Sequence, residues 1–122
     1  MDDTQRLIVN AEFALKYMDT IKQYMGYCNN DREEFLENTM VQDACITQIK
    51  NITQCVNKIR DRYPDVYNTY FSERHQKGLK GMRNILIHEY ESRNEKEIWR
   101  FYVTDMPELE TIFSKMISEN TA

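Results

Sequence analysis

The sequence predicts an all-α fold, an up-and-down antiparallel bundle of four to five helices. Its 122 residues include three glycines and two prolines, too few for the many turns of a β fold. Apolar residues recur at alternating steps of three and four, the spacing of one face of a helix. The connections between these stretches are short, so consecutive helices are expected to be antiparallel neighbours.

Length and composition predict one compact domain over residues 1–122. A chain of 122 residues is long enough for a single hydrophobic core without a metal or a disulfide. Hydrophobic residues make up 41% of it and charged residues 30%, which excludes a disordered tail. The formal net charge of −4 argues against a general nucleic-acid coat but is compatible with a local basic site.

The same features predict a cytoplasmic protein. No apolar stretch approaches the roughly 20 residues that cross a bilayer, so no membrane contact is expected. The chain begins Met1-Asp2-Asp3, which is acidic where a secretory signal would be basic. The cysteines form no Cys-x-x-Cys pair, so we interpret them as reduced thiols, with two on or near an apolar seam. They are Cys28, Cys45 and Cys55.

The first helix is predicted by apolar residues that recur from Leu7 to Met25. Asp3 or Thr4 is expected to cap its beginning, since both side chains accept hydrogen bonds from free backbone N–H groups. Gly26 and the Asn-Asn pair that follows it are the stop and turn signals.

The second helix is predicted from about residue 32 to Arg62. Asp31 is followed three residues later by Glu34, a capping-box pattern, and Pro64 disfavours helical backbone at the residue before it. Residues 64–71 are expected to form a loop with a short turn of helix. The apolar seam of the second helix comprises Val41, Cys45, Ile49, Ile52, Val56 and Ile59.

Three further helices complete the predicted bundle. The third is expected from about Ser72 to Glu91. Asn94 begins a capping-box pattern for a fourth, and Pro107 is expected to restart the chain in the first turn of a last helix. The apolar face of the last helix comprises Leu109, Ile112, Phe113, Met116 and Ile117.

The sequence contains none of the motifs that mark common metal or phosphate sites. The two histidines, His75 and His88, fit no His-Glu-x-x-His or Cys-His spacing, and phosphate loops and nucleophile elbows are absent. Paired carboxylates lie at helix starts, where the helix dipole explains them. We therefore predict neither a metal nor a cofactor.

The third helix holds the candidate chemistry. From Arg74 to His88 the chain has no carboxylate, although the protein is acidic. With Arg83 set at zero and about 100° per residue, Lys80 falls at about 60°, Asn84 at about 100° and His88 at about 140°. The apolar residues of this segment fall mainly on the opposite side. Ile87 lies within the polar arc, which indicates a cover such as a partner subunit.

A guanidinium and an imidazole on one surface, without a metal, suit phosphodiester cleavage in RNA. The imidazole of His88 can take the proton of a ribose 2′-hydroxyl or deliver one to the leaving oxygen. The guanidinium of Arg83 can hold the phosphate and stabilise its developing charge. The non-catalytic alternatives are that the basic run is a solvated helix face and that His88 is a surface histidine bonded to a neighbour.

These residues lie in a stretch that resembles a known family motif. Residues 82–90 read Met-Arg-Asn-Ile-Leu-Ile-His-Glu-Tyr, similar to the Arg-x4-His-x-Tyr signature of the HepT-like branch of the HEPN (higher eukaryotes and prokaryotes nucleotide-binding) superfamily. The segments 41–46 and 105–109 are similar as well, so the resemblance covers nearly the whole chain. A Pro-Trp pair that many relatives carry before the motif is missing. Gly78 and Gly81 stand there instead and are expected to allow close helix approach.

The resemblance implies a helical toxin of a type VII toxin–antitoxin pair, a metal-independent endoribonuclease that acts as a homodimer. Arg83 and His88 would be its catalytic pair, with Asn84 as the polar residue after the arginine and Lys80 in support. The implied antitoxin is a minimal, MntA-like nucleotidyltransferase that transfers AMP to the motif tyrosine, here Tyr90. Tyr90 falls at about −20°, so AMP there would cover the phosphate site of Arg83.

Three alternatives remain open at this point. The first is a non-catalytic helical binding or adaptor module that is paired with a nucleotidyltransferase. The second is a nucleotide-binding bundle whose basic run grips phosphates. For Tyr90 alone, the plain alternative is a tyrosine of the bundle or interface with its hydroxyl hydrogen-bonded.

Overall fold

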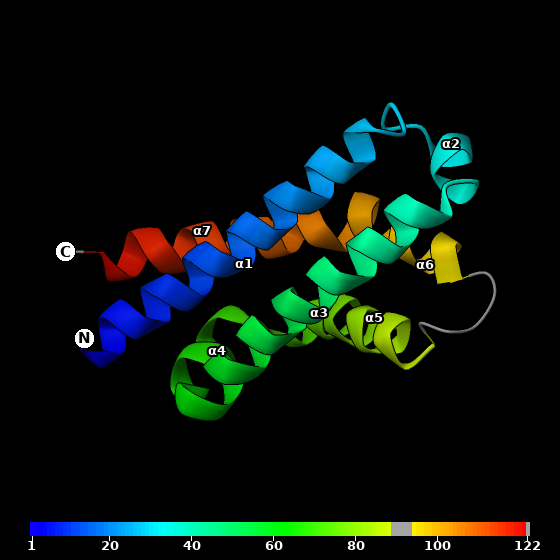
Figure 1. Cartoon of the computed structure of the whole chain (residues 1–122). Coiled ribbons are helices and arrows are strands. Elements are labelled where there is room, and N and C mark those ends of the chain that lie inside the picture. Colours follow the sequence, from blue (N-terminus) through cyan, green and yellow to red (C-terminus); the bar gives the residue numbers. More distant parts are fainter. Residues whose placement is uncertain (89–93, 122) are drawn as a thin grey trace.

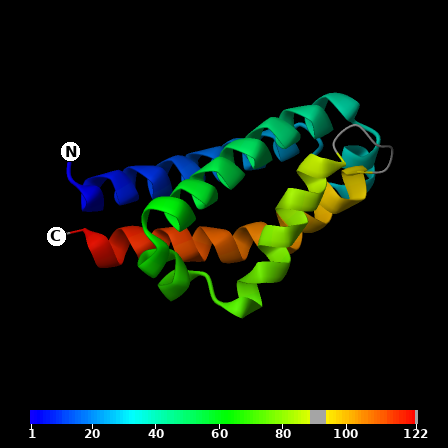
Figure 2. The ribbon, with the colours of Figure 1, turned by 90° about the horizontal axis from the view of Figure 1, so that it is seen from below.

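The chain folds as an up-and-down helical bundle, as the sequence predicts. The computed structural model describes residues 1–88 and 94–121, and every regular element in these ranges is helical. α1 leads away from the N-terminus, α3 returns beside it, α5 leads away again at an incline and α6–α7 return, so both termini lie at one end (Figures 1 and 2). The elements are α1 (Asp3–Gly26), α2 (Arg32–Leu36), α3 (Thr39–Arg62), α4 (Pro64–Tyr70), η1 (Glu73–His75), α5 (Gln76–Ile87), α6 (Asn94–Arg100), η2 (Phe101–Asp105) and α7 (Met106–Asn120).

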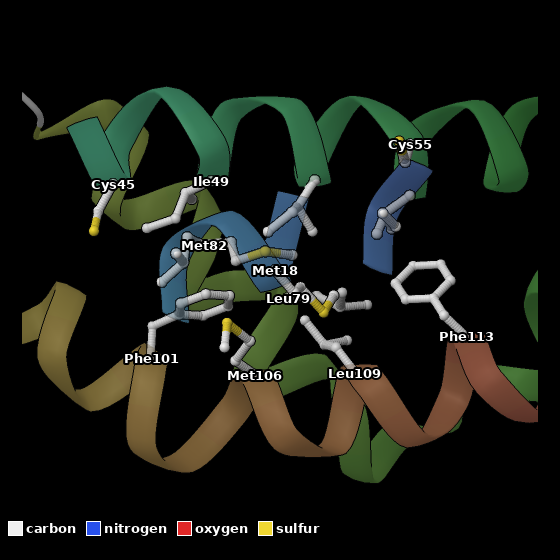
Figure 3. Packing of buried hydrophobic residues seen from close by; sticks show 14 of the residues in the cluster. Met18, Cys45, Ile49, Cys55, Leu79, Met82, Phe101, Met106, Leu109 and Phe113 are labelled. Carbon is white, nitrogen blue, oxygen red and sulfur yellow. The ribbon is translucent and has the colours of Figure 1, made fainter. Parts of the chain in front are cut away.

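The core lies between α1, α3, α5 and α7, where the predicted apolar seams meet (Figure 3). All six seam residues of the predicted second helix are buried, as is the stripe from Leu7 to Met25 on α1. Leu79 and Met82 of α5 and Phe101 of η2 are buried in this core (Figure 3). Within residues 1–88 and 94–121, no helix is both long and apolar enough to span a membrane.

The three cysteines are buried and form no disulfide, as predicted. Burial raises the pKa of the Cys45 thiol to about 12, because an apolar environment disfavours the thiolate. Burial also raises the pKa of Cys55. The cysteines therefore act as small apolar core residues rather than as nucleophiles.

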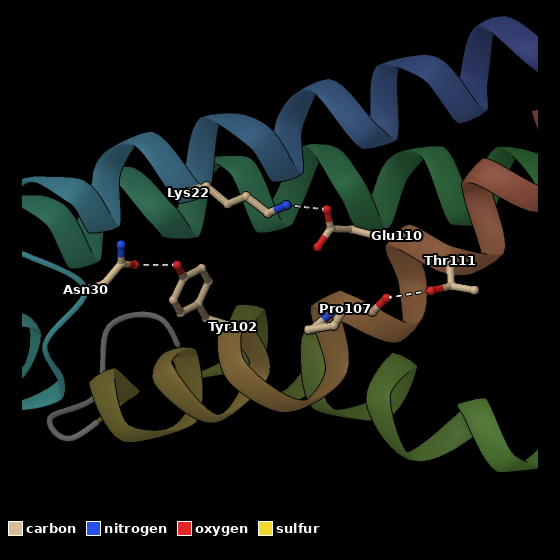
Figure 4. A network of polar contacts seen from close by, with 6 residues as sticks. All are labelled: Lys22, Asn30, Tyr102, Pro107, Glu110 and Thr111. Atoms are coloured by element: carbon tan, nitrogen blue, oxygen red, sulfur yellow. Dashed lines mark hydrogen bonds and ion pairs between the residues drawn. The ribbon is translucent and has the colours of Figure 1, made fainter.

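The beginning of α1 differs by one residue from the prediction. Asp2 caps the helix, because its side chain accepts a hydrogen bond from the N–H of Gln5 (2.8 Å) while its own N–H donates to the Gln5 side chain (3.0 Å). Neither Asp3 nor Thr4 is the cap. The far end follows the prediction: α1 ends at Gly26, and Asn30, in left-handed backbone with φ 53°, accepts a hydrogen bond from the Tyr102 hydroxyl at 2.5 Å (Figure 4).

The predicted second helix is wrong as a single element, because it breaks into α2 and α3. Asn38 stands between them, and its side chain accepts a hydrogen bond from the N–H of Val41 (3.0 Å). Asparagine at this position favours a new helix start over continuation. The short turn places Phe35 in the core, fully buried beside Trp99 of α6.

Residues 64–71 are also more ordered than predicted, since α4 spans Pro64–Tyr70. Pro64 stands in the first turn, where its missing N–H costs no hydrogen bond. The hydroxyl of Tyr70 donates to Glu119 at 2.6 Å and so ties α4 to the end of α7. This hydrogen bond joins residues far apart in the sequence, so the local sequence pattern could not predict the helix that it stabilises.

Pro107 lies in the first turn of α7, as predicted, but no break separates this helix from the preceding one. Helical backbone continues from Arg100 through η2, a π-helical turn, into α7, and the N–H of Met106 donates to the carbonyl of Phe101. A proline ring inside an ordinary helix clashes with the carbonyl four residues earlier. The wider π turn accommodates Pro107 without ending the helix.

α5 also packs against the π turn. Gly78 and Gly81 face it, and a Cβ atom at Gly81 would lie 2.6 Å from Nη2 of Arg100. A Cβ atom at Gly78 would lie 3.2 Å from the Cβ atom of Asp105. The predicted close approach at the two glycines is therefore confirmed. It brings α5 directly against η2.

Asp105 is a buried acidic residue at this contact between α5 and η2. Its side chain is 9% exposed, and Nη1 of Arg100 lies 3.1 Å from its Oδ2. This contact is an ion pair without hydrogen-bond alignment, so the buried Oδ2 accepts no hydrogen bond within the described residues. Desolvation dominates over the attraction of Arg100 and raises the pKa of Asp105 above its usual 3.8.

The raised pKa of Asp105 predicts a pH-dependent cost to stability. A carboxyl group with a raised pKa keeps its proton in the folded state after the unfolded chain has lost it, so its contribution falls as pH rises above 3.8. Asp105→Asn removes this penalty. Its free energy of unfolding, relative to the parent protein, is expected to increase between pH 3.8 and neutrality, as measured by urea denaturation.

The matched control is Asp43→Asn, because Asp43 is an exposed aspartate on α3. This control measures what an Asp→Asn change at an exposed position of the bundle contributes at each pH. An Asp105→Asn difference that is flat, or that shrinks towards neutrality, would contradict the assignment.

Candidate functional site

α5 carries the predicted site residues that the structure describes. The expected helix from Ser72 to Glu91 is too long at its beginning, because η1 precedes α5 and Ser72 stands before it in extended backbone. At its far end α5 stops at Ile87. His88 has non-helical backbone (φ −103°, ψ 20°) and caps α5 by donating its N–H to the carbonyl of Asn84 at 3.1 Å. Residues 89–91 lie outside the described residues.

The two faces of α5 agree with the prediction. Leu79, Met82 and Ile85 are buried against the core, whereas the polar residues of the predicted arc are exposed. This arc comprises Lys80, Arg83, Asn84 and His88. α5 therefore presents a guanidinium, an amide and an ammonium to solvent, and His88, which follows its last residue, presents an imidazole.

The exposed face is electropositive. Lys80 and Arg83 have no carboxylate within ion-pair distance among residues 1–88 and 94–121. Arg74, at the start of the basic run, lies 3.7 Å from Glu108, but both side chains are exposed and such a pair is weak. The positive charge of α5 is thus available to an anionic ligand.

Arg83 lies on α5, whereas His88 follows its last residue and has non-helical backbone. Between them Ile87 is 70% exposed. A large exposed apolar residue among polar ones is typical of a surface that a partner covers.

The end of α5 is fixed by the neighbouring helix. The buried side chain of Asn94 donates a hydrogen bond to the carbonyl of Ile85 at 3.1 Å. This carbonyl belongs to the last turn of α5, where helix carbonyls take partners from outside the helix. The bond places the start of α6 against the turn that contains His88. Tyr90 lies outside the described residues, so its position beside Arg83 stays a prediction.

Arg83 borders a narrow hollow between α3, α4 and α5, which we call the α3–α5 hollow. Sequence reasoning assigned Val56 to the seam of α3 but missed the polar residues beside it, because Asn57 and Arg60 look like ordinary surface positions. The signal was their spacing from Thr53, at four and seven residues on one helix face. The hollow is lined by Thr53, Val56, Asn57, Arg60, Tyr67, Leu79, Met82 and Arg83.

The described part of the chain offers no evident metal centre. No group of three or more histidine, cysteine, aspartate or glutamate side chains within it could hold a metal ion. His75 is engaged locally, where its Nδ1 accepts a hydrogen bond from the N–H of Ser72 at 3.2 Å. The exposed polar groups of α5 and His88 are guanidinium, ammonium, amide and imidazole groups.

Comparison with known proteins identifies the family of the chain. The family model described as "Ribonuclease HepT-like" matches residues 14–116. "Putative RNase MJ1216" of Methanocaldococcus jannaschii is 31% identical over 109 residues, which cover 86% of this chain and 82% of that protein. "Putative RNase MJ0125" of the same organism is 32% identical over 109 residues, 86% of this chain and 85% of its own. No solved structure gives a significant match. The chain is thus a member of the HepT-like ribonuclease family, with an all-α bundle of the HEPN type.

Proposed function

We propose that the protein is the endoribonuclease toxin of a toxin–antitoxin pair and that it cleaves RNA without a metal. The observation that carries the proposal is the basic face of α5, where Arg83 is exposed without a carboxylate partner among the described residues and His88 is exposed at the helix end. Family membership supports a ribonuclease. We expect the protein to act in the cytoplasm, where its RNA substrate is present.

The proposed reaction uses the ribose 2′-hydroxyl as the nucleophile. The imidazole of His88 removes its proton, the 2′-oxygen bonds to phosphorus, and the bond from phosphorus to the 5′-oxygen breaks. The leaving 5′-oxygen takes a proton from a second imidazole. Arg83 donates hydrogen bonds to the non-bridging oxygens and stabilises the charge that builds up on them.

A homodimer supplies the second imidazole. Arg83 lies on α5 and His88 follows its end, so two copies of this helix end would bring a second arginine and a second imidazole to one site. Exposed Ile87 supports this arrangement, because an apolar side chain between the two catalytic groups gains burial at a dimer interface. Lys80 and Asn84 extend the polar surface and contact neighbouring phosphate or ribose oxygens.

The proposal predicts that Arg83→Ala and His88→Ala each abolish cleavage. Loss of acid–base catalysis is expected to cost about 10²- to 10⁴-fold in rate, and loss of charge stabilisation about 10²- to 10³-fold. Both variants are expected to keep the circular dichroism and melting temperature of the parent protein, since both side chains are exposed. Cleavage of a fluorescent RNA by purified protein measures the rates.

Arg32→Ala is the matched control, because Arg32 is an exposed arginine on α2 and pairs with the adjacent Glu33. It is expected to cleave at the parental rate. Parental activity in His88→Ala would refute the assignment of this residue. An inactive parent protein that still binds a nucleotidyltransferase would favour the adaptor module over the nuclease.

The antitoxin is proposed to be a minimal nucleotidyltransferase that transfers AMP to Tyr90. The anionic group would occupy the phosphate site of Arg83 and block RNA. Incubation of the protein with this partner and ATP is expected to add the mass of one or more AMP groups, and Tyr90→Phe abolishes the gain. Tyr27→Phe is the control, because Tyr27 is 79% exposed and thus freely accessible. A mass gain that survives Tyr90→Phe but not Tyr27→Phe would contradict the proposal.

A further inference from the structure

α1 carries apolar side chains on its outer face as well as on the face that packs against the core. Its buried stripe from Leu7 to Met25 packs against α3 and α7. Val9 and Phe13 lie on the opposite side of the helix, about 200° and 240° around its axis from Leu7. Phe13 is 46% exposed. A single exposed apolar residue is ordinary, and a partner is indicated only where the shape and charge around it also match one.

Beside Phe13 the outer surface of α1 holds an open hollow of about 190 Å³. Four residues line it at positions i, i+3, i+4 and i+7 of the helix, namely Val9, Glu12, Phe13 and Lys16. Four residues of one helix form the hole that receives a side chain in the knobs-into-holes packing of two helices. A protein cavity of about 150 Å³ holds a benzene molecule, so this hollow has room for one aromatic ring. The outer face of α1 therefore has the shape that receives a side chain from another helix.

Phe13 also has the place of a knob on the same face. Its ring stacks on that of Tyr17, with ring centroids 6.1 Å apart and an angle of 23° between the planes. Tyr17 is half-buried and packs against the core, so the Phe13 ring has a fixed neighbour on one side. One face thus offers both a hole and an aromatic knob, and such a face can fit a second copy of itself about a two-fold axis.

The charges around the hollow favour an antiparallel second copy. Glu12 and Lys16 lie one turn apart at its edge, and neither forms an ion pair within residues 1–88 and 94–121. A parallel second α1 would bring equal charges together. An antiparallel one, with Phe13 over the hollow of the other copy, brings Lys16 of one copy near Glu12 of the other. Helical side chains lean toward the N-terminus of their own helix, so these two lean toward each other.

We propose that two copies of the protein associate through the outer faces of their α1 helices, which lie antiparallel about a two-fold axis. The Phe13 ring of each copy fills the hollow of the other, and Glu12 and Lys16 form two ion pairs beside the rings. This surface differs from the proposed dimer surface at the end of α5, because α5 packs against α3, α6 and η2. The contact does not rest on the proposed ribonuclease function. One pair of helices is small for an interface, so we expect a reversible association that depends on protein concentration.

The test is sedimentation velocity of the purified protein over a series of concentrations. Glu12→Lys puts two lysines at each ion-pair position, and Lys16→Glu puts two glutamates there. Each variant alone is expected to need about tenfold more protein than the parent to reach the same association. An equal mixture of the two variants is expected to associate as the parent does, because lysines of one then face glutamates of the other. The like charges within each helix remain in the mixture, so its recovery reports contact between copies.

Phe13→Ala tests the ring and leaves the charges in place. It is expected to weaken the association about tenfold or more, because it removes the aromatic residue at the centre of the contact. Met40→Ala is the matched control, because Met40 is 78% exposed on α3. Asp43→Lys and Lys58→Glu, at exposed positions of α3, change the net charge as Glu12→Lys and Lys16→Glu do. These three controls are expected to associate as the parent does.

The outcomes separate this inference from the proposed function. RNA cleavage per chain is expected to stay parental in Glu12→Lys and Phe13→Ala, since neither residue belongs to the basic face of α5. The inference is overturned if these variants associate as the parent does, or if the mixture of Glu12→Lys and Lys16→Glu fails to recover; the nuclease proposal then stands. If the parent associates as expected but cleaves no RNA, the proposed function fails and the α1 contact stands.

Discussion

The close contact between α5 and the π turn is the constraint on which the functional surface depends. Gly78 and Gly81 let α5 approach η2 until Arg100 and Asp105 lie directly against its backbone. A Cβ atom at Gly78 would be tight against Asp105, and one at Gly81 would require the end of the Arg100 side chain to move. The buried carboxylate of Asp105 makes the arrangement costly at neutral pH, because its desolvation is only partly offset by Arg100. The contact that positions α5 thus includes an unfavourable desolvation of Asp105.

The fixed position of α5 determines which of its side chains are exposed to solvent. Its apolar side is committed to α3 and to the core, so Lys80, Arg83 and Asn84 have to face outward. Asn94 bonds to the last turn of α5 and sets where the chain leaves the helix at His88. Side chains on a rigid helix start from a defined orientation, which reduces the ordering cost when they meet a transition state. The α3–α5 hollow follows from the same packing, because the contact of α3 with α5 brings Arg60 to the rim that Arg83 borders.

The periodic parts of the fold were predictable and the junctions were not. Apolar spacing identified the buried faces of α1, α3, α5 and α7, because burial of a helix stripe leaves a direct trace in the sequence. The break at Asn38 and the helix of Pro64–Tyr70 depend on one side-chain cap and on the bond from Tyr70 to Glu119, neither of which has a periodic signal. The π turn was missed for a related reason. Pro107 marks the first turn of α7 correctly, but no local pattern shows that helical backbone continues through a wide turn before it.

The same division holds for the site. Arg83, Asn84 and His88 could be singled out because a run without carboxylates in an acidic protein is visible in the sequence, and the structure places all three on the surface. Arg60 and Tyr67 could not, because they come from α3 and α4 and reach the hollow through tertiary packing alone. His88 also showed the limit of helical projection. The helix ends at the residue before it, so angles extrapolated beyond that point have no helical backbone beneath them in the described residues.

The central claim is that basic and imidazole groups of the protein itself cleave RNA through the 2′-hydroxyl. The most direct measurement is the chemistry of the new RNA ends formed by the purified protein in the presence of a strong chelator. The account predicts cleavage that continues in the chelator and yields a 2′,3′-cyclic phosphate and a 5′-hydroxyl, since the ribose oxygen displaces the 5′-oxygen. Products with a 3′-hydroxyl and a 5′-phosphate, or cleavage that stops when metal is removed, would contradict it.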